Sequence, residues 1–342
     1  MIISLDEFLQ LRKTLPVADV RSEGEFAEGR IRGAINIPLL NNEERIAVGT
    51  DYKQKGQSEA IKTGFRLVGP RLHKLVEDAL LHASNEEMVV HCWRGGMRSA
   101  NFCRFVEMAG IKTHSLSGGY KTYRSRAVES FANPFQFKII GGCTGSGKTE
   151  ILSALKNAGE QVIDLEKLAS HKGSVFGGLM LPPQPTTEQF QNDLFEELLK
   201  LDLKRQIWIE DESIAIGKIF LPDLFWRTMS SSPVVELDVK KEIRVARLVN
   251  EYGKANHEDF LKAMEKIVKR LGGQHFKSAK EKLLVGDMNT TIDILLTYYD
   301  KTYLYGLEGK KKRIVNRIAW DGVDAKSFVK EILDHTNTLS EK

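Results

Sequence analysis

The chain has 342 residues, more than one hydrophobic core usually serves, so two domains are expected. With 42% hydrophobic and 28% charged residues it is neither disordered nor fibrous, and a net charge of +4 permits an anionic partner without identifying one. Cys92, Cys103 and Cys143 form neither a zinc-type spacing nor a disulfide framework, which predicts a reducing, cytoplasmic compartment. The chain start lacks a secretion signal, and no apolar run approaches the roughly 18 residues of a membrane span, so no membrane partner is expected.

The first half alternates short apolar runs with helical patterns. Residues 17–21 and 88–91 predict strands, and residues 22–28, 61–68 and 71–82 predict helices. This order is typical of a small α/β domain with a parallel sheet. We expect this domain to span residues 1–130.

The predicted strand at 88–91 leads directly into Cys92, and a helical stretch begins near Ser99. Backbone N–H groups and the positive helix end converge at such a loop, which favours a thiolate and an anion. Arg94 and Arg98 add positive charge, and Arg98 is suited to fork onto a bound oxyanion. We therefore predict that Cys92, Arg94 and Arg98 are catalytic, a role that requires Cys92 to be reachable from solvent.

Glycines complete this loop. Gly95 and Gly96 allow a tight turn without a Cβ penalty, so we expect their backbone to hold phosphate. The alternative is that Cys92 is a buried, inert cysteine. That is the expectation for Cys103, which lies among Phe102 and Phe105 on the following helix.

Several motifs of this half resemble the rhodanese family, over residues 1–128. They are Asp19-Val20-Arg21-Ser22, Glu25-Phe26, Gly29 and Ile31-Arg32-Gly33-Ala34-Ile35-Asn36-Ile37-Pro38. The resemblance implies that Cys92 is the persulfide-forming residue. One departure is that His91-Cys92-x5-Arg98 also resembles the signature of cell-cycle dual-specificity phosphatases, whereas ordinary sulfurtransferases have a loop shorter by one residue. The wider loop suits a tetrahedral phosphate or a selenium atom, and predicts that phosphate or arsenate competes with the donor for Cys92.

The second half begins near residues 134–137 with a strand at 138–140, a Gly-x4-Gly-Lys-Thr motif, and a helix at 150–158. A strand before and a helix after are the context that a Walker A loop requires. Backbone N–H groups of such a loop wrap phosphate oxygens, while its lysine neutralises them. The predicted phosphate-binding residues are Gly142, Thr144, Gly145, Ser146, Gly147, Lys148 and Thr149. No role is predicted for Cys143.

Further strands are expected at residues 161–164, 207–210, 234–238 and 291–295. Together they predict a doubly wound parallel sheet of the P-loop NTPase type, spanning residues 131–342, with its ligand at the carboxyl strand ends. Acidic residues 210–212 follow one strand, so Asp211 and Thr149 are candidate Mg²⁺ ligands. A solvated acidic turn explains the cluster equally well.

Candidate substrate contacts lie on loops and helices after these strands. Asp164 precedes a polar, Gly-rich loop in which Lys172 and Ser174 make an anion contact plausible, although His171 is by default a bystander. Arg244 and Arg247 stand where P-loop kinases carry lid arginines, and a solvated helical face explains them almost as well.

The region from His257 through Lys282 is helical, basic and interrupted by Gly272-Gly273. Its lysines and Arg270, with residues 310–313, could follow a phosphate backbone, and tyrosines 298, 299, 303 and 305 could stack on unpaired bases. Interspersed acids make a solvated face with core tyrosines an equal alternative.

The two halves together resemble the tRNA 2-selenouridine synthase family over nearly the whole chain. The most specific segments are residues 52–56, 91–99, 141–149, 164–178, 210–213 and 270–274. The resemblance implies that wobble 2-thiouridine in a tRNA anticodon loop becomes 2-selenouridine through an S-geranyl intermediate. Selenophosphate and geranyl diphosphate are then co-substrates, no cofactor is tightly bound, Mg²⁺ is a candidate, and selenophosphate synthetase is a candidate donor source. In this scheme Cys92 is a carrier or nucleophile, and the Walker A loop grips a diphosphate.

Two other classes of function stay open. A Cys-dependent phosphatase would release phosphate from an aryl phosphate without tRNA or selenium. A P-loop kinase regulated by a non-catalytic rhodanese module would keep its turnover after Cys92→Ala.

Overall fold

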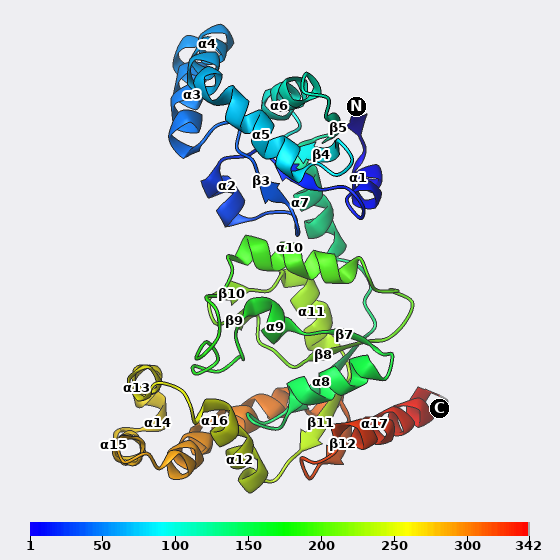
Figure 1. Ribbon diagram of the computed structural model, residues 1–342. Coiled ribbons are helices and arrows are strands. Elements are labelled where there is room, and N and C mark those ends of the chain that lie inside the picture. Colours follow the sequence, from blue (N-terminus) through cyan, green and yellow to red (C-terminus); the bar gives the residue numbers. More distant parts are fainter. Residues whose placement is uncertain (341–342) are drawn as a thin grey trace. The chain divides into compact units, whose positions relative to one another are not determined.

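The computed structural model describes residues 1–340, and of residues 307–308 and 335–340 the backbone alone. The chain divides into two compact units. Unit 1 comprises Met1–Ser130 and Gln191–Glu196, and unit 2 comprises Phe131–Phe190 and the chain from Glu197 onward. Each is an α/β unit on a parallel sheet, the fold class that the sequence predicts (Figure 1). Within residues 1–340, no helix has the length and apolar character needed to cross a bilayer.

Unit 1 contains a five-stranded parallel sheet in the order β1-β5-β4-β2-β3. Its strands are β1 (Ile2–Ile3), β2 (Val17–Asp19), β3 (Ile35–Asn36), β4 (Glu87–His91) and β5 (Lys112–Leu116). The central strand β4 is buried from Met88 onward, as expected for a parallel strand covered on both faces. Since β2 and β4 pair with Asp19 opposite His91, residues 19–21 and Cys92 emerge at one edge of this sheet.

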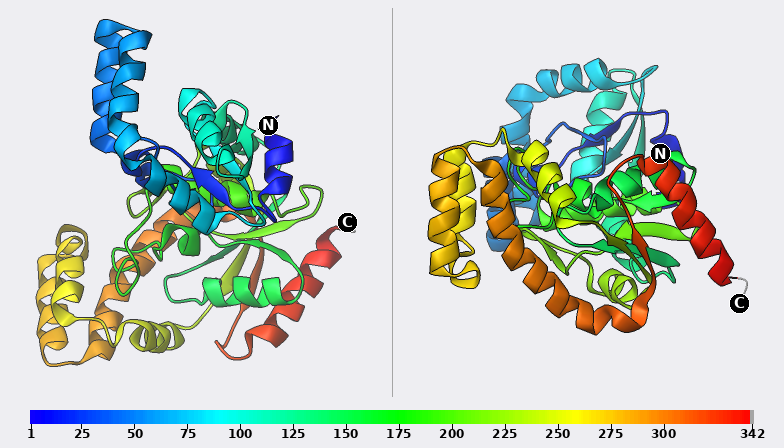
Figure 2. Two further views of the ribbon diagram at one scale, coloured as in Figure 1. Left: turned by 45° about the horizontal axis from the view of Figure 1, so that its top comes forward. Right: turned by 90° about the horizontal axis from the view of Figure 1, so that it is seen from below.

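The helices of unit 1 connect these strands. They are α1 (Leu5–Leu11), α2 (Glu23–Glu28), α3 (Asn42–Lys55), α4 (Gln57–Val68), α5 (Leu72–His82), α6 (Met97–Glu107) and α7 (Gly119–Ser130). The helices predicted at 22–28, 61–68 and 71–82 are confirmed. Helix α3, begun by a capping box of Asn41 and Glu44, was not predicted; it has no buried residue and forms with α4 a hairpin that projects from the unit 1 sheet (Figure 2).

Unit 2 contains a second five-stranded parallel sheet in the order β12-β11-β6-β8-β7, beside a small antiparallel β9–β10 pair. Its strands are β6 (Phe137–Gly142), β7 (Gln161–Ile163), β8 (Ile207–Glu210), β9 (Ala215–Ile216), β10 (Ile219–Phe220), β11 (Val234–Asp238) and β12 (Ile314–Ala319). The predicted Walker A segment follows the central strand β6, so its loop lies at the carboxyl edge of the sheet.

One predicted strand is wrong. Residues 291–295 lie within helix α16 (Met288–Lys310), and the outer strand of the sheet is β12. The isoleucine-rich composition of 291–295 favours a strand, but Met288, Ile292, Leu295 and Leu296 are buried together at helical spacing. The side chain of Asp287 caps the helix by accepting a hydrogen bond from Thr290 N at 3.0 Å.

Two of the hydrophobic cores of unit 2 are formed by different groups of helices. Helices α8 (Lys148–Asn157) and α17 (Ala325–Ser340) pack on one face of the sheet, where Ile151, Trp208 and Ile332 are buried together. Helices α12 to α15 pack beside the first half of α16 and form a helical core with it (Figures 1 and 2). The remaining helices are α9 (Leu165–Ala169), α11 (Asp223–Ser231), α12 (Lys241–Tyr252), α13 (His257–Glu265), α14 (Val268–Leu271) and α15 (Gly273–Leu284). Helix α10 (Thr187–Leu198) is divided, because Gln191–Glu196 belongs to unit 1.

Candidate active site

The Cys92 loop, residues 92–98, joins β4 to α6 and is held from beneath by the start of α7. Tyr120 N donates to Cys92 O at 2.8 Å, and Lys121 N donates to Trp93 O at 2.9 Å. A Cβ on Gly119 would lie 2.4 Å from Cys92 O, so only glycine allows this approach. Gly95 has φ of +63°, which supports the predicted tight turn.

Cys92 itself is buried, with an exposed fraction of 2%. Its Sγ lies 3.2 Å from the Ser99 hydroxyl, which also donates to Gly96 O at 3.1 Å. The expectation that the sulfur is reachable from solvent is therefore wrong for this conformation. The loop has to open before Cys92 can meet a substrate, since a nucleophile must come within about 3–3.5 Å of the atom it attacks.

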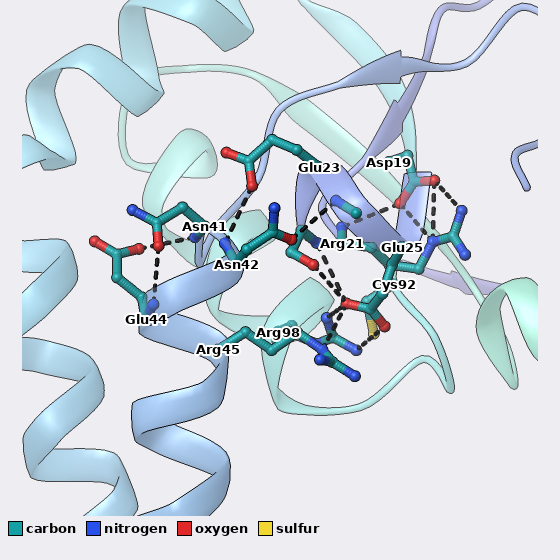
Figure 3. A network of polar contacts seen from close by, with 12 residues as sticks. Asp19, Arg21, Glu23, Glu25, Asn41, Asn42, Glu44, Arg45, Cys92 and Arg98 are labelled. Atoms are coloured by element: carbon teal, nitrogen blue, oxygen red, sulfur yellow. Dashed lines mark hydrogen bonds and ion pairs between the residues drawn. The ribbon is translucent and has the colours of Figure 1, made fainter. Parts of the chain in front are cut away.

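Arg98 lies in the first turn of α6 and is bound to a carboxylate from α2. Its guanidinium donates to Glu25 at 2.6 and 3.3 Å, and Arg45 from α3 reaches the same carboxylate at 3.0 Å (Figure 3). These two arginines lower the pKa of Glu25 despite its partial burial, which alone would raise it. Arg94 is exposed, so the predicted pair of loop arginines divides into one exposed and one engaged guanidinium.

A buried ion pair lies behind the loop at the ends of β2 and β4. Arg21 Nη2 lies 2.6 Å from Asp19 Oδ2, both side chains are fully buried, and the guanidinium stacks 3.8 Å above the Tyr120 ring. Burial lowers the pKa of His91, whose Nε2 lies 3.7 Å from Asp19 Oδ2. The Asp-x-Arg motif of the sequence thus serves as a support for the loop and α7.

In unit 2 the Walker loop, residues 142–149, joins β6 to α8. Lys148 Nζ donates to Gly142 O at 3.1 Å, and Gly145 and Gly147 have φ of +82° and +81°. The buried Ser146 hydroxyl has no hydrogen-bond partner among the described residues. A lysine bound to a neutral carbonyl and an unpartnered hydroxyl are groups that a phosphate ligand can engage.

Helix α16 supplies a contact to this loop that the sequence did not predict. The Tyr303 hydroxyl accepts from Gly142 N at 2.8 Å and donates to Glu236 Oε2 at 2.6 Å. A Cβ on the neighbouring Gly141 would lie 2.6 Å from the same Glu236 oxygen. Two consecutive glycines before the loop were the available signal for this close approach.

The two candidate lid arginines already have protein partners. Arg244 is buried, pairs with both carboxylate oxygens of Asp300 at 2.7 and 2.8 Å, and reaches Thr144 O at 3.3 Å. Arg247 pairs with Glu150, donates to Gly322 O at 2.8 Å and stacks on Trp320. Neither the solvated face nor a free lid describes Arg244, which instead braces the Walker loop.

Acidic side chains gather beside Thr149, although not in the predicted arrangement. The Thr149 hydroxyl donates to Glu166 Oε2 at 3.1 Å, whereas Asp211 is bound to Lys310 at 2.5 Å. Burial and neighbouring carboxylates raise the pKa of Glu212 to about 8 and raise that of Glu210. Among the side chains that the structure describes, no group of three His, Cys, Asp or Glu residues is arranged for a metal ion. Glu166, rather than Asp211, is the carboxylate placed to share a cation with Thr149.

The remaining predicted substrate contacts are dispersed. Asp164 caps α9 by accepting from Lys167 N at 2.8 Å, and Lys172 pairs with Glu251 at 2.5 Å. Burial lowers the pKa of the half-buried His171, and Ser174 Oγ accepts from Phe176 N at 3.2 Å in a tight turn. Arg270 is exposed and touches Tyr298 Oη at 3.4 Å. These groups are bound within unit 2, and no shared ligand position is defined by them.

The tyrosines of α16 do not form a single stacking surface. Tyr299 packs against the helical core and Tyr303 binds the Walker loop, whereas Tyr305 is exposed. The lysines at 262, 266, 269, 277 and 282 and Arg270 are exposed. The exposed lysines fit a solvated face as well as a contact to RNA, and Tyr299 is a core tyrosine.

The fold and loops define the class of the protein: a rhodanese-like unit with a cysteine loop, joined to a P-loop unit. The rhodanese-like domain family matches residues 4–126, and the family described as the tRNA 2-selenouridine synthase AAA domain matches residues 135–333. A tRNA 2-selenouridine synthase of Sulfurovum sp. (strain NBC37-1) is 35% identical, covering 92% of this chain and 94% of that protein. The chain belongs to the tRNA 2-selenouridine synthase family.

One solved structure is similar to part of the chain. It is the crystal structure of an N-terminal domain from a protein of Clostridium difficile 630, 38% identical, covering 37% of this chain and 98% of that one at a TM-score of 0.34.

Proposed function

We propose that this protein is a tRNA-modifying enzyme that converts wobble 2-thiouridine to 2-selenouridine, using geranyl diphosphate and selenophosphate. The observation that carries the proposal is the presence in one chain of a Cys-x5-Arg loop and a Walker loop, in a family named for this product. Each loop alone would be compatible with many reactions.

In the first step, the sulfur of 2-thiouridine attacks C1 of geranyl diphosphate, the C–O bond breaks and diphosphate leaves. The Walker loop is suited to hold that diphosphate because the Lys148 amino group donates to a neutral carbonyl oxygen and forms no ion pair within the part of the chain that the structure describes. Where Mg²⁺ binds, Thr149 and Glu166 would hold it, and the ion would neutralise part of the diphosphate charge. Nucleotide hydrolysis is not needed.

In the second step, the Cys92 thiolate attacks the phosphorus of selenophosphate, an S–P bond forms, and the P–Se bond breaks. The released hydroselenide attacks C2 of the S-geranyl base and expels geranylthiol, while water later hydrolyses the cysteinyl phosphate. This sequence needs no oxidant. The Ser99 hydroxyl, 3.2 Å from Cys92 Sγ, can turn from Gly96 O to donate to the thiolate.

The partners follow from this chemistry. A wobble base is unpaired and can be splayed into a pocket, so tRNA is recognised at its anticodon loop. Selenophosphate synthetase is the expected source of the donor, and the cytoplasm the expected compartment.

The test is mass spectrometry of tRNA nucleosides after incubation with both donors. The intact protein should form 2-selenouridine, and Cys92→Ala should accumulate S-geranyl-2-thiouridine without the selenium product. Cys103→Ala, which removes a core thiol from α6, is the matched control. A Cys92→Ala protein that still forms 2-selenouridine at the control rate would refute the assignment of Cys92. Unmodified tRNA from the intact protein would refute the function.

A further inference from the structure

The carboxylate of Glu25 occupies a position formed by two arginines from different elements. Arg98, in the first turn of α6, lies 2.6 Å away, and Arg45, in the first turn of α3, lies 3.0 Å away (Figure 3). The exposed fraction of the Glu25 side chain is 13%, whereas that of Arg45 is 48%. One carboxylate therefore lies between two guanidinium groups that reach it from solvent-accessible helices.

Arg45 is brought to this position by bonds between α2 and the start of α3. Gly24 N donates to Asn42 Oδ1 at 2.9 Å, and Asn42 N donates to Glu23 Oε2 at 3.1 Å. The Asn41 capping box fixes the first turn of α3, from which Arg45 extends. The ion pair between Arg45 and Glu25 is thus fixed by hydrogen bonds between the two helices and is not an incidental surface contact.

The cluster of Glu25, Arg45 and Arg98 has more positive than negative charge. Glu25 supplies one negative charge to two guanidinium groups, whereas a phosphate-type group supplies close to two charges and three acceptor oxygens. Guanidinium forks bind phosphate and carboxylate with the same geometry. A tetrahedral oxyanion would therefore satisfy Arg45 and Arg98 better than the carboxylate does.

The position also adjoins the nucleophile. Arg98 ends the Cys92 loop, and the next residue, Ser99, touches Cys92 Sγ at 3.2 Å. An anion bound to Arg98 would lie at the start of α6, where loop and helix N–H groups favour it. With Glu25 in place, Cys92 is 2% exposed.

We propose that Glu25 is an internal stand-in for the oxyanion of the donor, and that Arg45 is a further ligand of that oxyanion. A phosphate-type group binds Arg45 and Arg98 by displacing the Glu25 carboxylate, which swings away and lets the Cys92 loop open. The bound group then lies over Cys92 Sγ and shields it from other reagents. The inference deepens the proposed function, on which it rests, by assigning Arg45 and the displacement of Glu25 to the donor site. No covalent change is involved in this step.

The experiment measures alkylation of Cys92 by iodoacetamide, read by peptide mass spectrometry, with increasing inorganic phosphate. Glu25→Gln keeps the capping box with Ser22, since Gln serves at this capping position, but loses the charge that competes for the arginines. The half-protecting phosphate concentration should fall about 3–10-fold in this variant, and Cys92 should be alkylated faster without phosphate, because weaker charge pairing releases the loop.

Arg45→Ala should raise the half-protecting concentration about 10-fold, as expected for the loss of a charged ligand. Arg66→Ala is the matched control, an exposed arginine of the same hairpin, and should match the unsubstituted protein. Circular dichroism establishes that each variant is folded. Protection unchanged by Glu25→Gln, or by Arg45→Ala, would overturn the proposal and leave Glu25 as a structural brace.

The two levels of inference fail separately. If phosphate does not protect Cys92 in the unsubstituted protein, the oxyanion site is refuted even where tRNA is selenated normally. If protection behaves as described but no 2-selenouridine forms, the donor site stands and the proposed function is refuted.

Discussion

The Cys92 loop and the Walker loop have similar backbone geometry, but the cation in each loop has a different partner. Each follows a buried parallel strand, turns on glycines with positive φ, and leads into a helix. In the Cys92 loop the cation Arg98 holds a protein carboxylate, whereas in the Walker loop the cation Lys148 holds a neutral carbonyl. The same local geometry therefore presents one closed and one open anion position.

The difference arises from what faces each loop. Helix α2 brings Glu25 to Arg98, and α16 brings the hydroxyl of Tyr303, a neutral group, to the Walker loop. An anion entering the Cys92 loop has to replace a carboxylate, which makes binding selective for ligands with more charge. An anion entering the Walker loop has to replace the Gly142 carbonyl at Lys148 and the Glu166 carboxylate at Thr149, neither of which forms an ion pair with the loop. We therefore expect the diphosphate donor to bind without displacing a paired charge.

The sharpest test of the open loop is Lys148→Ala. Removal of the only charged group that the loop offers should lower S-geranyl-2-thiouridine formation about 100-fold or more, since lost charge stabilisation at a leaving diphosphate is costly. Nucleoside mass spectrometry with geranyl diphosphate alone measures the effect. Lys156→Ala, in the last turn of α8, should leave it unchanged. Geranylation that survives Lys148→Ala would place the diphosphate elsewhere.

The next largest effect is expected at Gly119, where the start of α7 packs against the Cys92 loop. Gly119→Ala places a Cβ 2.4 Å from Cys92 O and 2.5 Å from Gly95 N, at a φ of +61°. We expect a loss of about 2–4 kcal/mol in the unfolding free energy of unit 1, because backbone atoms cannot yield as side chains do. Denaturant unfolding measures it.

Gly33→Ala is the matched control, because its φ is +80° with open space around it. It should cost only about 1 kcal/mol of backbone strain. Equal losses in the two variants would show that the Gly119 contact does not hold the Cys92 loop.

Strand patterns and glycine spacing predicted the fold class, both loops and the helix after each. They could not predict what faces the loops, since Glu25 lies 73 residues from Arg98 along the sequence and Tyr303 lies 161 residues from Gly142. Arg45 reaches the Cys92 loop only through Glu25. The predicted strand at 291–295 failed because β-branched composition does not reveal that Ile292, Leu295 and Leu296 share a helical face. Arg244 resembled a lid arginine in sequence because its partner, Asp300, lies on a distant helix.

Loss of the Tyr303 hydroxyl, which contacts the Walker loop, should have a smaller effect on stability. Tyr303→Phe removes the hydroxyl shared by Gly142 N and Glu236, leaving a buried acceptor without its donor, and should cost about 1–3 kcal/mol of unit 2 stability. Tyr305→Phe, on an exposed ring of the same helix, should change stability by less than about 0.5 kcal/mol. Chemical unfolding compares the two, and equal values would show that Tyr303 does not support the loop.

The last effect is one of pH, because the pKa of Glu212 is raised in unit 2 whereas the pKa of Glu25 is lowered in unit 1. The pKa of Glu212 is raised to about 8 by burial and by Glu166, so the folded protein keeps a proton that the unfolded chain loses above its ordinary pKa. Its contribution to stability is complete at acidic pH and declines as pH rises toward 8, so unit 2 should lose about 1–3 kcal/mol between pH 6 and pH 8.5. Glu212→Gln should remove most of this loss.

In unit 1, burial raises the pKa of Glu25, but Arg98 and Arg45 lower it by more, so the net shift is downward. The contribution of Glu25 to stability is therefore complete above its ordinary pKa and declines only in acid. Between pH 6 and pH 8.5, Glu25→Gln should therefore leave the pH slope of unit 1 unchanged. Hydrogen-exchange mass spectrometry of β4 and β8 peptides separates the two units. A unit 2 slope that persists in Glu212→Gln would assign the loss to another group, and a flat slope would show that Glu212 is ionised at neutral pH. The open loop would then carry negative charge that repels a diphosphate, and the contrast between the two anion positions would disappear.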